Sequence, residues 1–160
     1  PLEDTPDTVK IEHYTPRDLD NELTYKNLLA VCYGGRGKPY KEQTCDTHKR
    51  KTVLIIDPQN KSHTDQIYYG MDGAIRARNT QIQADLDSVL DLNCVRLKGV
   101  RKQVLMAFCA VMKRDKQDKT ASKGYLEKKL QTYQERQHGR YSPYCGILIW
   151  YLQRRIRQCS

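Results

Sequence analysis

A chain of 160 residues is long enough for one domain, or for a small module with a helical appendage. Its 38% hydrophobic and 29% charged residues are typical of a globular protein and exclude a disordered one. No apolar run approaches the roughly 18 residues of a membrane-spanning helix, and no basic-then-apolar leader opens the chain. We therefore expect a cytoplasmic protein without a membrane partner.

Positive charge exceeds negative charge and is concentrated towards the end of the chain. The 28 Lys and Arg against 19 Asp and Glu give a net charge of +9. Residues 113–160 carry 12 basic and 4 acidic side chains, whereas residues 1–112 carry 16 and 15. The excess favours a polyanionic partner such as nucleic acid, although surplus basic residues also keep proteins soluble.

Two strands are expected near the beginning of the chain, after an irregular lead-in over residues 1–8. Residues 9–14, VKIEHY, alternate apolar and polar side chains and predict a strand that ends near His13. A loop follows from Pro16. Residues 25–32, YKNLLAVC, predict the second strand.

A short helix and a hairpin are expected next. A loop bearing Gly and Lys, residues 33–44, leads to CDTHKRKT, residues 45–52, which predicts a helix with Asp46 near its start. The apolar residues that follow are stopped by Asp57-Pro58. Residues 66–77, QIYYGMDGAIRA, have the signature of a hairpin with its turn at Met-Asp-Gly.

Helical periodicity dominates the remainder. Ile82, Leu86 and Leu90 recur at intervals of four residues behind an Asn or Thr cap. We expect helices over residues 79–93, 95–114, 125–140 and 142–158, with a polar linker over residues 115–124. The second of these helices is expected to bury one stripe, made of Leu97, Val100, Val104, Phe108 and Val111.

The last helix has two features that each allow two interpretations. Trp150 and Tyr151 belong either to the core, which we prefer, or to a surface that binds a partner. Arg154, Arg155 and Arg157 at its C-terminal end either complement the helix dipole or contact nucleic acid.

The residues around His13 carry the groups that phosphodiester hydrolysis needs. An imidazole is a suitable base near neutral pH, and His13 supplies one. Glu12 and Asp46 supply hard oxygen ligands for Mg²⁺ or Mn²⁺. Asn27, on the facing strand, is expected to hold the backbone of His13 by a hydrogen bond. Taken alone, a His at a strand end is more often an ordinary polar residue, and it is the ordered set that favours a site.

Two cysteines and a basic loop accompany this set. Cys32 and Cys45 are separated by a spacing too wide for one zinc knuckle unless a loop is inserted, so a pair of free thiols is an open alternative. The loop between them carries Arg36, Lys38 and Lys41. It is either a phosphate-binding loop or a solvated one.

The runs IEHYTPRD, YKNLLAVC and QTCDTHKRK together resemble the HNH (ββα-metal) nucleases. More narrowly, the chain is similar to the Septu-type and retron-associated HNH family, which is encoded beside an ABC-type ATPase in bacterial anti-phage systems. DLDSVLDLNCVRLKGVRKQVL and YSPYCGILIWYLQRRI also look like the helical part of that family. The resemblance implies an α+β fold, with an HNH module over residues 1–60 and a hairpin and mainly α-helical, partner-binding part over residues 61–160.

The resemblance also implies roles for individual residues. His13 matches the general base and Asn27 the central Asn, while Glu12 and Asp46 match ligands of a catalytic Mg²⁺ or Mn²⁺. His48 is a possible substitute ligand or phosphate contact. Cys32 and Cys45 match half of a structural Zn²⁺ site, whose first Cys pair is expected upstream of Pro1. The residues expected to contact nucleic acid are Arg36, Lys38, Lys41, Lys49 and Arg50.

The sequence therefore predicts a metal-dependent HNH endonuclease that acts with an ABC-type ATPase in anti-phage defence, with DNA favoured over RNA as substrate. The alternative is a basic, zinc-stapled adaptor that binds nucleic acid or the ATPase without cutting. Salt-sensitive binding that survives loss of His13 and of divalent metal distinguishes the adaptor.

Overall fold

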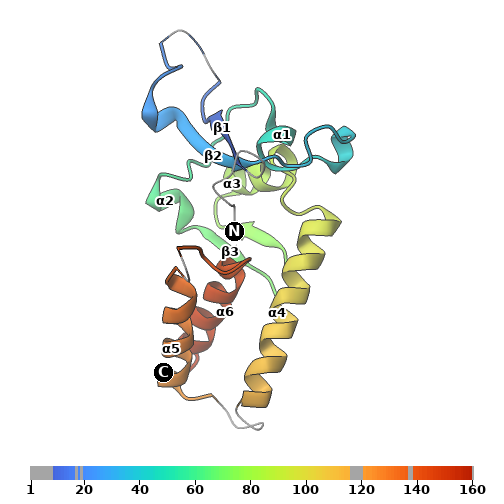
Figure 1. The fold of residues 1–160 in the computed structure, drawn as a ribbon. Helices are drawn as coiled ribbons and strands as arrows, with labels where there is room; N and C mark the ends of the chain where they lie inside the picture. The colour runs from blue at the N-terminus through green and yellow to red at the C-terminus, as the bar shows by residue number, and fades with distance from the viewer. Residues whose placement is uncertain (1–8, 17, 19, 116–120, 137–138, 160) are drawn as a thin grey trace. The chain divides into compact units, whose positions relative to one another are not determined.

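The computed structural model describes residues 9–16, 18, 20–115, 121–136 and 139–159. The expected lead-in over residues 1–8, residues 116–120 of the expected linker and residues 137–138 of the third expected helix lie outside the described residues. Helices and two small two-stranded sheets make the fold mixed α+β, which confirms the predicted class (Figure 1).

Two compact units make up the chain and are described separately. The strand unit contains the described residues up to 67 together with residues 76–94, and the helical unit contains residues 68–75 and those from 95 onward. The expected hairpin is present as β3 (Ile67–Tyr69) and β4 (Ile75–Ala77), which pair with each other.

The strand unit begins with an antiparallel pair, β1 (Val9–His13) and β2 (Leu28–Cys32), in which Val9 lies opposite Cys32 and His13 opposite Leu28. Successive side chains of a strand point to opposite faces. Lys10 and Glu12 therefore share one face of β1, and Ile11 and His13 share the other. The expected second strand is shorter than predicted, because its first residues form the 3₁₀ turn η1 (Tyr25–Asn27).

Residues 33–44 form a closed loop that returns the chain to the end of β2. The N–H of Thr44 donates to the carbonyl of Gly34 at 2.8 Å, and Gly34 has φ of +53°, where a Cβ would collide with the carbonyl oxygen of Thr44. Only glycine fits this approach without strain. The loop contains the 3₁₀ turn η2 (Tyr40–Glu42) and ends at the predicted helix, α1 (Cys45–Lys49), which packs against β2.

The second half of the strand unit begins with a capped helix. Asn79, one of the two caps that the sequence allowed, caps α3 (Thr80–Ala84) by accepting from the N–H groups of Gln81 and Ile82. The helix continues as a π-helical turn, η3 (Asp85–Val89), and so ends earlier than the predicted residue 93.

Asp85 lies at the junction of these turns and is 5% exposed. Its Oδ2 accepts from the N–H groups of Ile55 and Ile56 at 2.6 and 2.8 Å, and the hydroxyl of Tyr14 donates to the carbonyl of Leu54 at 3.0 Å. The irregular segment after α1 is thereby held by hydrogen bonds from two sides. It leads to the single-turn helix α2 (Lys61–Thr64).

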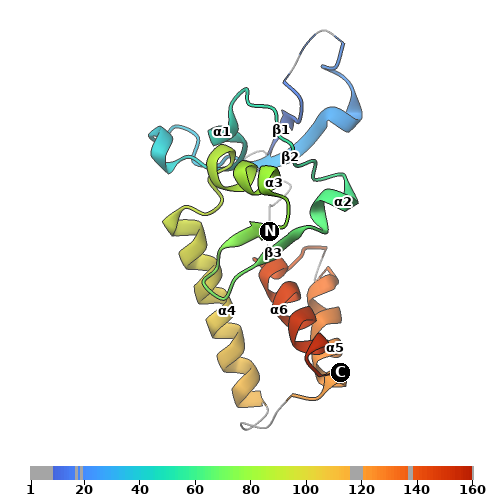
Figure 2. The same ribbon diagram turned by 180° about the vertical axis from the view of Figure 1, so that it is seen from behind.

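The helical unit contains α4 (Val95–Asp115), α5 (Lys123–Gln134) and α6 (Cys145–Arg157). Contacts join α6 to both α4 and α5, and Figure 2 shows α5 and α6 side by side. The helices bury apolar side chains from all three elements. The largest members of this core with exposed fractions of 1% or less are Leu105, Leu126, Ile147 and Leu152.

The stripe predicted for the first long helix was partly wrong. Phe108 is buried as expected, but Val111 is 39% exposed and Arg101 is 8% exposed. Arg101 is buried because its Nε donates to the carbonyl of Gly73 at 2.7 Å, in the turn of the hairpin. Gly73 itself lies directly against the backbone of Lys98. Where the turn of the hairpin contacts α4, the buried side chain is therefore the charged Arg101 and not an apolar one.

Trp150 and Tyr151 pack against the core of the helical unit, which confirms the preferred interpretation of these aromatics. The guanidinium of Arg154 lies over the Trp150 ring, and Arg155 donates to the hydroxyl of Tyr151 at 3.1 Å. Together with Arg157, these two arginines lie in the last turn of α6, where positive charge suits the helix dipole.

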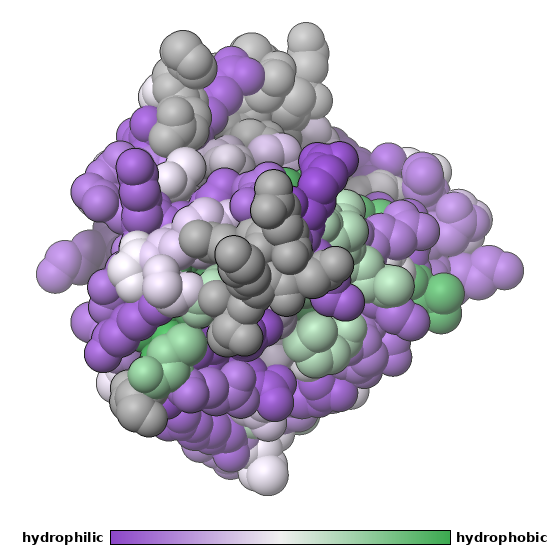
Figure 3. Space-filling view, turned by 90° about the horizontal axis from the view of Figure 1, so that it is seen from below, coloured by the Kyte–Doolittle hydropathy of each residue, from purple (hydrophilic) through white to green (hydrophobic). Residues whose placement is uncertain are grey.

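Among the described residues, no helix has the length and apolar character needed to cross a membrane. The face shown in Figure 3 is mainly hydrophilic, with hydrophobic side chains in small separate patches.

Replacing Asp85 with Ala tests the buried hydrogen bonds of the strand unit. We expect the free energy of unfolding in urea to fall by about 1–3 kcal/mol, because the two buried N–H groups of Ile55 and Ile56 lose their acceptor. Asp87→Ala is the matched control, since Asp87 is exposed on the same turn. Equal losses in the two variants would contradict the role given to Asp85.

Candidate metal and phosphate site

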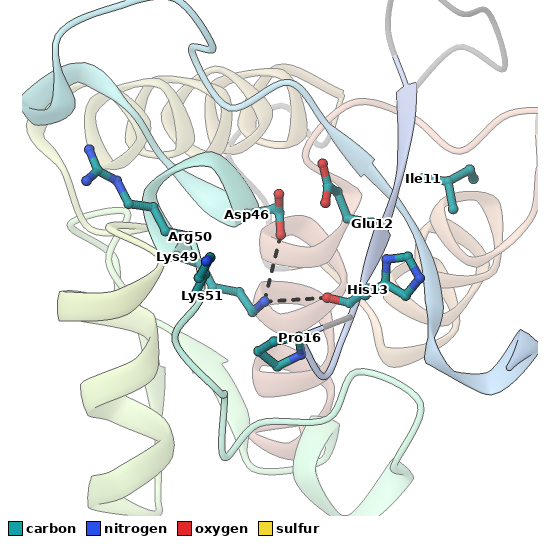
Figure 4. A pocket seen from close by; sticks show the side chains of 8 residues that line it. All are labelled: Ile11, Glu12, His13, Pro16, Asp46, Lys49, Arg50 and Lys51. Atoms are coloured by element: carbon teal, nitrogen blue, oxygen red, sulfur yellow. Dashed lines mark hydrogen bonds and ion pairs between the residues drawn. The ribbon is translucent and has the colours of Figure 1, made fainter. Parts of the chain in front are cut away.

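A pocket of about 490 Å³ lies where β1 ends and α1 packs on the sheet. Figure 4 shows Glu12 and Asp46 extending side by side into it from these two elements. The pocket contains both acidic and basic groups, which is the composition expected of a site for cations and phosphates. Its lining residues are Ile11, Glu12, His13, Pro16, Asp46, Lys49, Arg50 and Lys51.

The carboxylates of Glu12 and Asp46 converge on one ammonium group, that of Lys10. The Lys10 Nζ lies 2.7 Å from Glu12 Oε1 and 2.9 Å from Asp46 Oδ2. The side chains of Lys10 and Asp46 are 14% and 15% exposed, so solvent screens this pair only in part. Burial alone lowers the pKa of Lys10, but the hydrogen bonds to Glu12 and Asp46 and their negative charges outweigh it and raise that pKa.

Lys49 supplies a second ammonium group to the same pocket. Its side chain is 4% exposed, and its Nζ lies 3.9 Å from Asp46 Oδ1 and 3.5 Å from the backbone oxygen of His13 (Figure 4). Buried charges are normally paired, and these two contacts are long for a lysine so deeply placed. The ammonium therefore retains capacity to donate to an anion in the pocket.

His13 is anchored through its imidazole on the face of β1 that does not carry Glu12. Its Nε2 lies 2.9 Å from the carbonyl oxygen of Glu22. A carbonyl only accepts, so Nε2 carries the hydrogen, and in the neutral ring the lone pair is on Nδ1. The structure brings His13 to the pocket wall but does not place its ring beside the carboxylates.

Asn27 is buried and holds the chain that leaves β1. Its Oδ1 accepts from the N–H of Thr15 at 2.7 Å, and its Nδ2 donates to the carbonyl of Thr15 at 3.2 Å. Its backbone oxygen accepts from the N–H of Tyr14 at 2.8 Å. These bonds reach the two residues that follow His13, whereas the sequence predicted that Asn27 holds the backbone of His13 itself.

Cys32 and Cys45 are neighbours in space, because the loop between them closes at Gly34. A hydrogen bond from Cys45 and backbone N–H groups, including that of Gly34, lower the pKa of Cys32 to about 6, against the opposing effect of burial. A thiolate is the form that binds metals.

Two thiolates are half of a tetrahedral zinc site. The part of the chain that the structure describes contains no group of three or more His, Cys, Asp or Glu side chains that could hold a metal ion. A zinc site at Cys32 and Cys45 needs further ligands and stays a prediction.

The other pair, Glu12 and Asp46, has the oxygen donors that suit a divalent cation. Mg²⁺ and Mn²⁺ prefer oxygen ligands, and Mg²⁺ is commonly held by one or two carboxylates with water and substrate phosphates completing the shell. Glu12 and Asp46 already direct oxygens at a common cation, the ammonium of Lys10. When bound there, such an ion would stabilise negative charge on a phosphate and its leaving oxygen.

His48 and the basic loop residues lie away from the carboxylates. The His48 ring stacks on Tyr40 with 4.2 Å between centroids, and its Nδ1 lies 2.9 Å from the carbonyl oxygen of Val89. Arg50 lines the pocket, but its guanidinium lies 4.5 Å from the Tyr40 ring centroid. Three further residues expected to contact nucleic acid are exposed and do not line the pocket, namely Arg36, Lys38 and Lys41.

The sequence prediction missed Lys10, Lys51 and Tyr40. For Lys10 a signal was present, because it lies two residues before Glu12 in a strand and therefore on the same face. Its second partner, Asp46, is 36 residues away, so that contact was not visible in the pattern.

No match was found when the chain was compared with protein-family models, with curated proteins and with solved structures. The resemblance to HNH nucleases therefore rests on the motif residues themselves.

Replacing Asn27 with Ala tests its structural role. We expect a loss of about 1–3 kcal/mol in the free energy of unfolding, because the peptide groups of Thr15 lose partners in a partly buried setting. Lys26→Ala, at an exposed neighbouring position, is the control and is expected to change it by less than about 0.5 kcal/mol. A loss no larger than in the control would refute the assignment.

Alkylation of Cys32 by iodoacetamide tests the thiol pair. The thiolate is the reactive form, so the rate is expected to be high above pH 6 and to fall as pH is lowered through about 6, the pKa of Cys32. Cys45→Ala removes the main hydrogen bond and is expected to move the midpoint upwards. Mass spectrometry of the peptide that contains Cys32 measures the rate, and an unmoved midpoint contradicts the pairing.

Proposed function

We propose that this protein is a divalent-metal-dependent endonuclease of the HNH type, which hydrolyses phosphodiester bonds of nucleic acid. The observation that carries the proposal is the convergence of Glu12 and Asp46, from β1 and α1, at a pocket whose wall also holds Lys49. The order of an antiparallel strand pair followed by a short helix on β2 is consistent with a ββα-metal module.

In the proposed mechanism the residues of the pocket divide the work. Glu12 and Asp46 would hold the cation, which would stabilise negative charge on the leaving oxygen. His13 accepts a proton from the attacking water at Nδ1, since the carbonyl of Glu22 holds the hydrogen on Nε2. The resulting hydroxide forms a bond to phosphorus while the bond to the leaving oxygen breaks, and the leaving oxygen takes a proton from solvent. Lys49 donates from its buried ammonium to a non-bridging phosphate oxygen. Asn27 keeps the chain after His13 in place through its bonds to Tyr14 and Thr15.

A nucleic-acid backbone suits the charge around the pocket. Arg50 and Lys51 lie at the rim and are exposed, and the loop residues Arg36, Lys38 and Lys41 are exposed on the same unit. Such groups contact phosphates without reading sequence. We favour DNA as the substrate, and cleavage of RNA is the other outcome of the test.

The helical unit is proposed to bind an ABC-type ATPase of a Septu-type or retron-type defence system. The support is the resemblance of its helices to that family, together with exposed apolar side chains on α4 such as Met106, which is 60% exposed. Co-purification of the two proteins, with Met106→Asp as the disrupting variant, tests the contact.

A non-catalytic adaptor is the second candidate, and one observation favours it. Both carboxylates are already paired with Lys10, and the His13 ring is hydrogen-bonded on the face of β1 opposite Glu12. A module that only binds nucleic acid has no need of a free cation site. It is expected to bind in a salt-sensitive manner with or without divalent metal.

Cleavage of plasmid DNA and of RNA in the presence of Mn²⁺ or Mg²⁺ separates the two candidates. We expect His13→Ala to lower the rate by about 10²–10⁴-fold, the usual contribution of a general base. Asp46→Asn and chelation of the metal are expected to abolish cleavage, because the cation loses its ligand or is removed.

Asp65→Asn is the matched control for Asp46→Asn, since Asp65 is an exposed carboxylate that is also paired with a lysine, Lys61. It is expected to cut at the wild-type rate. Cleavage at the wild-type rate by His13→Ala refutes its assignment as the base. Binding that survives chelation, with no cutting by any variant, supports the adaptor.

A further inference from the structure

We infer that Lys10 is a built-in competitor of the divalent cation, whose ammonium must leave Glu12 and Asp46 before a metal ion can bind both. The inference rests on the proposed function, because the metal is the one proposed there. It gives Lys10 the role of setting how much divalent cation the site needs.

The Lys10 ammonium occupies the place between the two carboxylates. The Nζ of Lys10 lies 2.7 Å from Glu12 Oε1 and 2.9 Å from Asp46 Oδ2, which are hydrogen-bonding distances to the oxygens that a shared cation would use. Mg²⁺ needs the lone pairs of such oxygens at about 2.0–2.1 Å. The Lys10 ammonium lies in the position between these two oxygens that a shared metal ion would occupy, and the two cations cannot occupy that position at once.

Lys10 is linked to Glu12 by only a short stretch of β1. Lys10 and Glu12 are two residues apart on one face of β1, and the Lys10 side chain is 14% exposed. A group held this way has a high effective concentration at its partner, unlike a salt ion from solution. The measured dissociation constant of the metal is the intrinsic constant divided by the fraction of molecules in which the ammonium has left the site, so it is higher the more fully Lys10 occupies the site.

Lys49 approaches Asp46 from a different side than Lys10 does. Its Nζ lies 3.9 Å from Asp46 Oδ1, the oxygen that Lys10 does not use. Lys49 can therefore stay in place when Lys10 leaves. Replacing Lys10 by a divalent ion would raise the positive charge beside Lys49, so metal and phosphate are expected to favour each other's binding.

Binding of Mn²⁺ alone to the full chain tests the inference, measured by electron paramagnetic resonance of the free ion and by the rise in the midpoint of thermal unfolding. Lys10→Met and Lys10→Gln remove the charge, and Lys10→Arg keeps it. We expect both neutral variants to bind Mn²⁺ at least tenfold more tightly than the wild type. Lys10→Arg is expected to bind like the wild type, and Lys10→Gln serves if Lys10→Met does not fold.

The double variant Lys10→Gln with Asp46→Asn shows whether Mn²⁺ binds at Asp46. It is expected to lose the gain in Mn²⁺ affinity that Lys10→Gln gives. Wild-type affinity in both neutral variants, or weaker binding, overturns the inference while leaving the proposed metal site intact. A gain that persists in the double variant also overturns it, because the ion then binds elsewhere. Absence of Mn²⁺ binding in every variant overturns both the inference and the proposed function.

Discussion

The backbone contact between Gly34 and Thr44 determines the geometry of the candidate site. Because the N–H of Thr44 reaches the carbonyl of Gly34 at 2.8 Å, the chain leaves β2 and returns to its end after a closed loop. This closure places Cys45 beside Cys32 and brings Asp46 over the face of β1 that carries Glu12. A side chain at position 34 would push Thr44 away, and with it the start of α1.

Charge balance then decides what the pocket can do. Two carboxylates, Glu12 and Asp46, face two ammonium groups, Lys10 and Lys49, at a partly buried position where Coulomb interactions are stronger than in water. The group is neutral as it stands. The charges therefore balance without a bound ion, and exchange of one ammonium for a metal ion would make the pocket attractive to phosphate.

Local patterns predicted much of the fold. The alternation in residues 9–13, the Asn79 cap and the Met-Asp-Gly turn each correspond to an observed element, because such signals depend on neighbours in sequence. The stripe of α4 was less well predicted, since the burial of Arg101 depends on Gly73 in the preceding hairpin. The early end of the helix at Val89 was missed too.

For the candidate site, the sequence by itself determined which chemical groups are present and that Lys10 and Glu12 share a face of β1. It also determined a short helix with Asp46 near its start. Only the tertiary structure decided that both carboxylates meet the ammonium of Lys10 and that the carbonyl of Glu22 holds Nε2 of His13. It also decided that His48, predicted as a possible ligand or phosphate contact, stacks on Tyr40. The physical reason is that these contacts join residues through loop closure, which no local periodicity encodes.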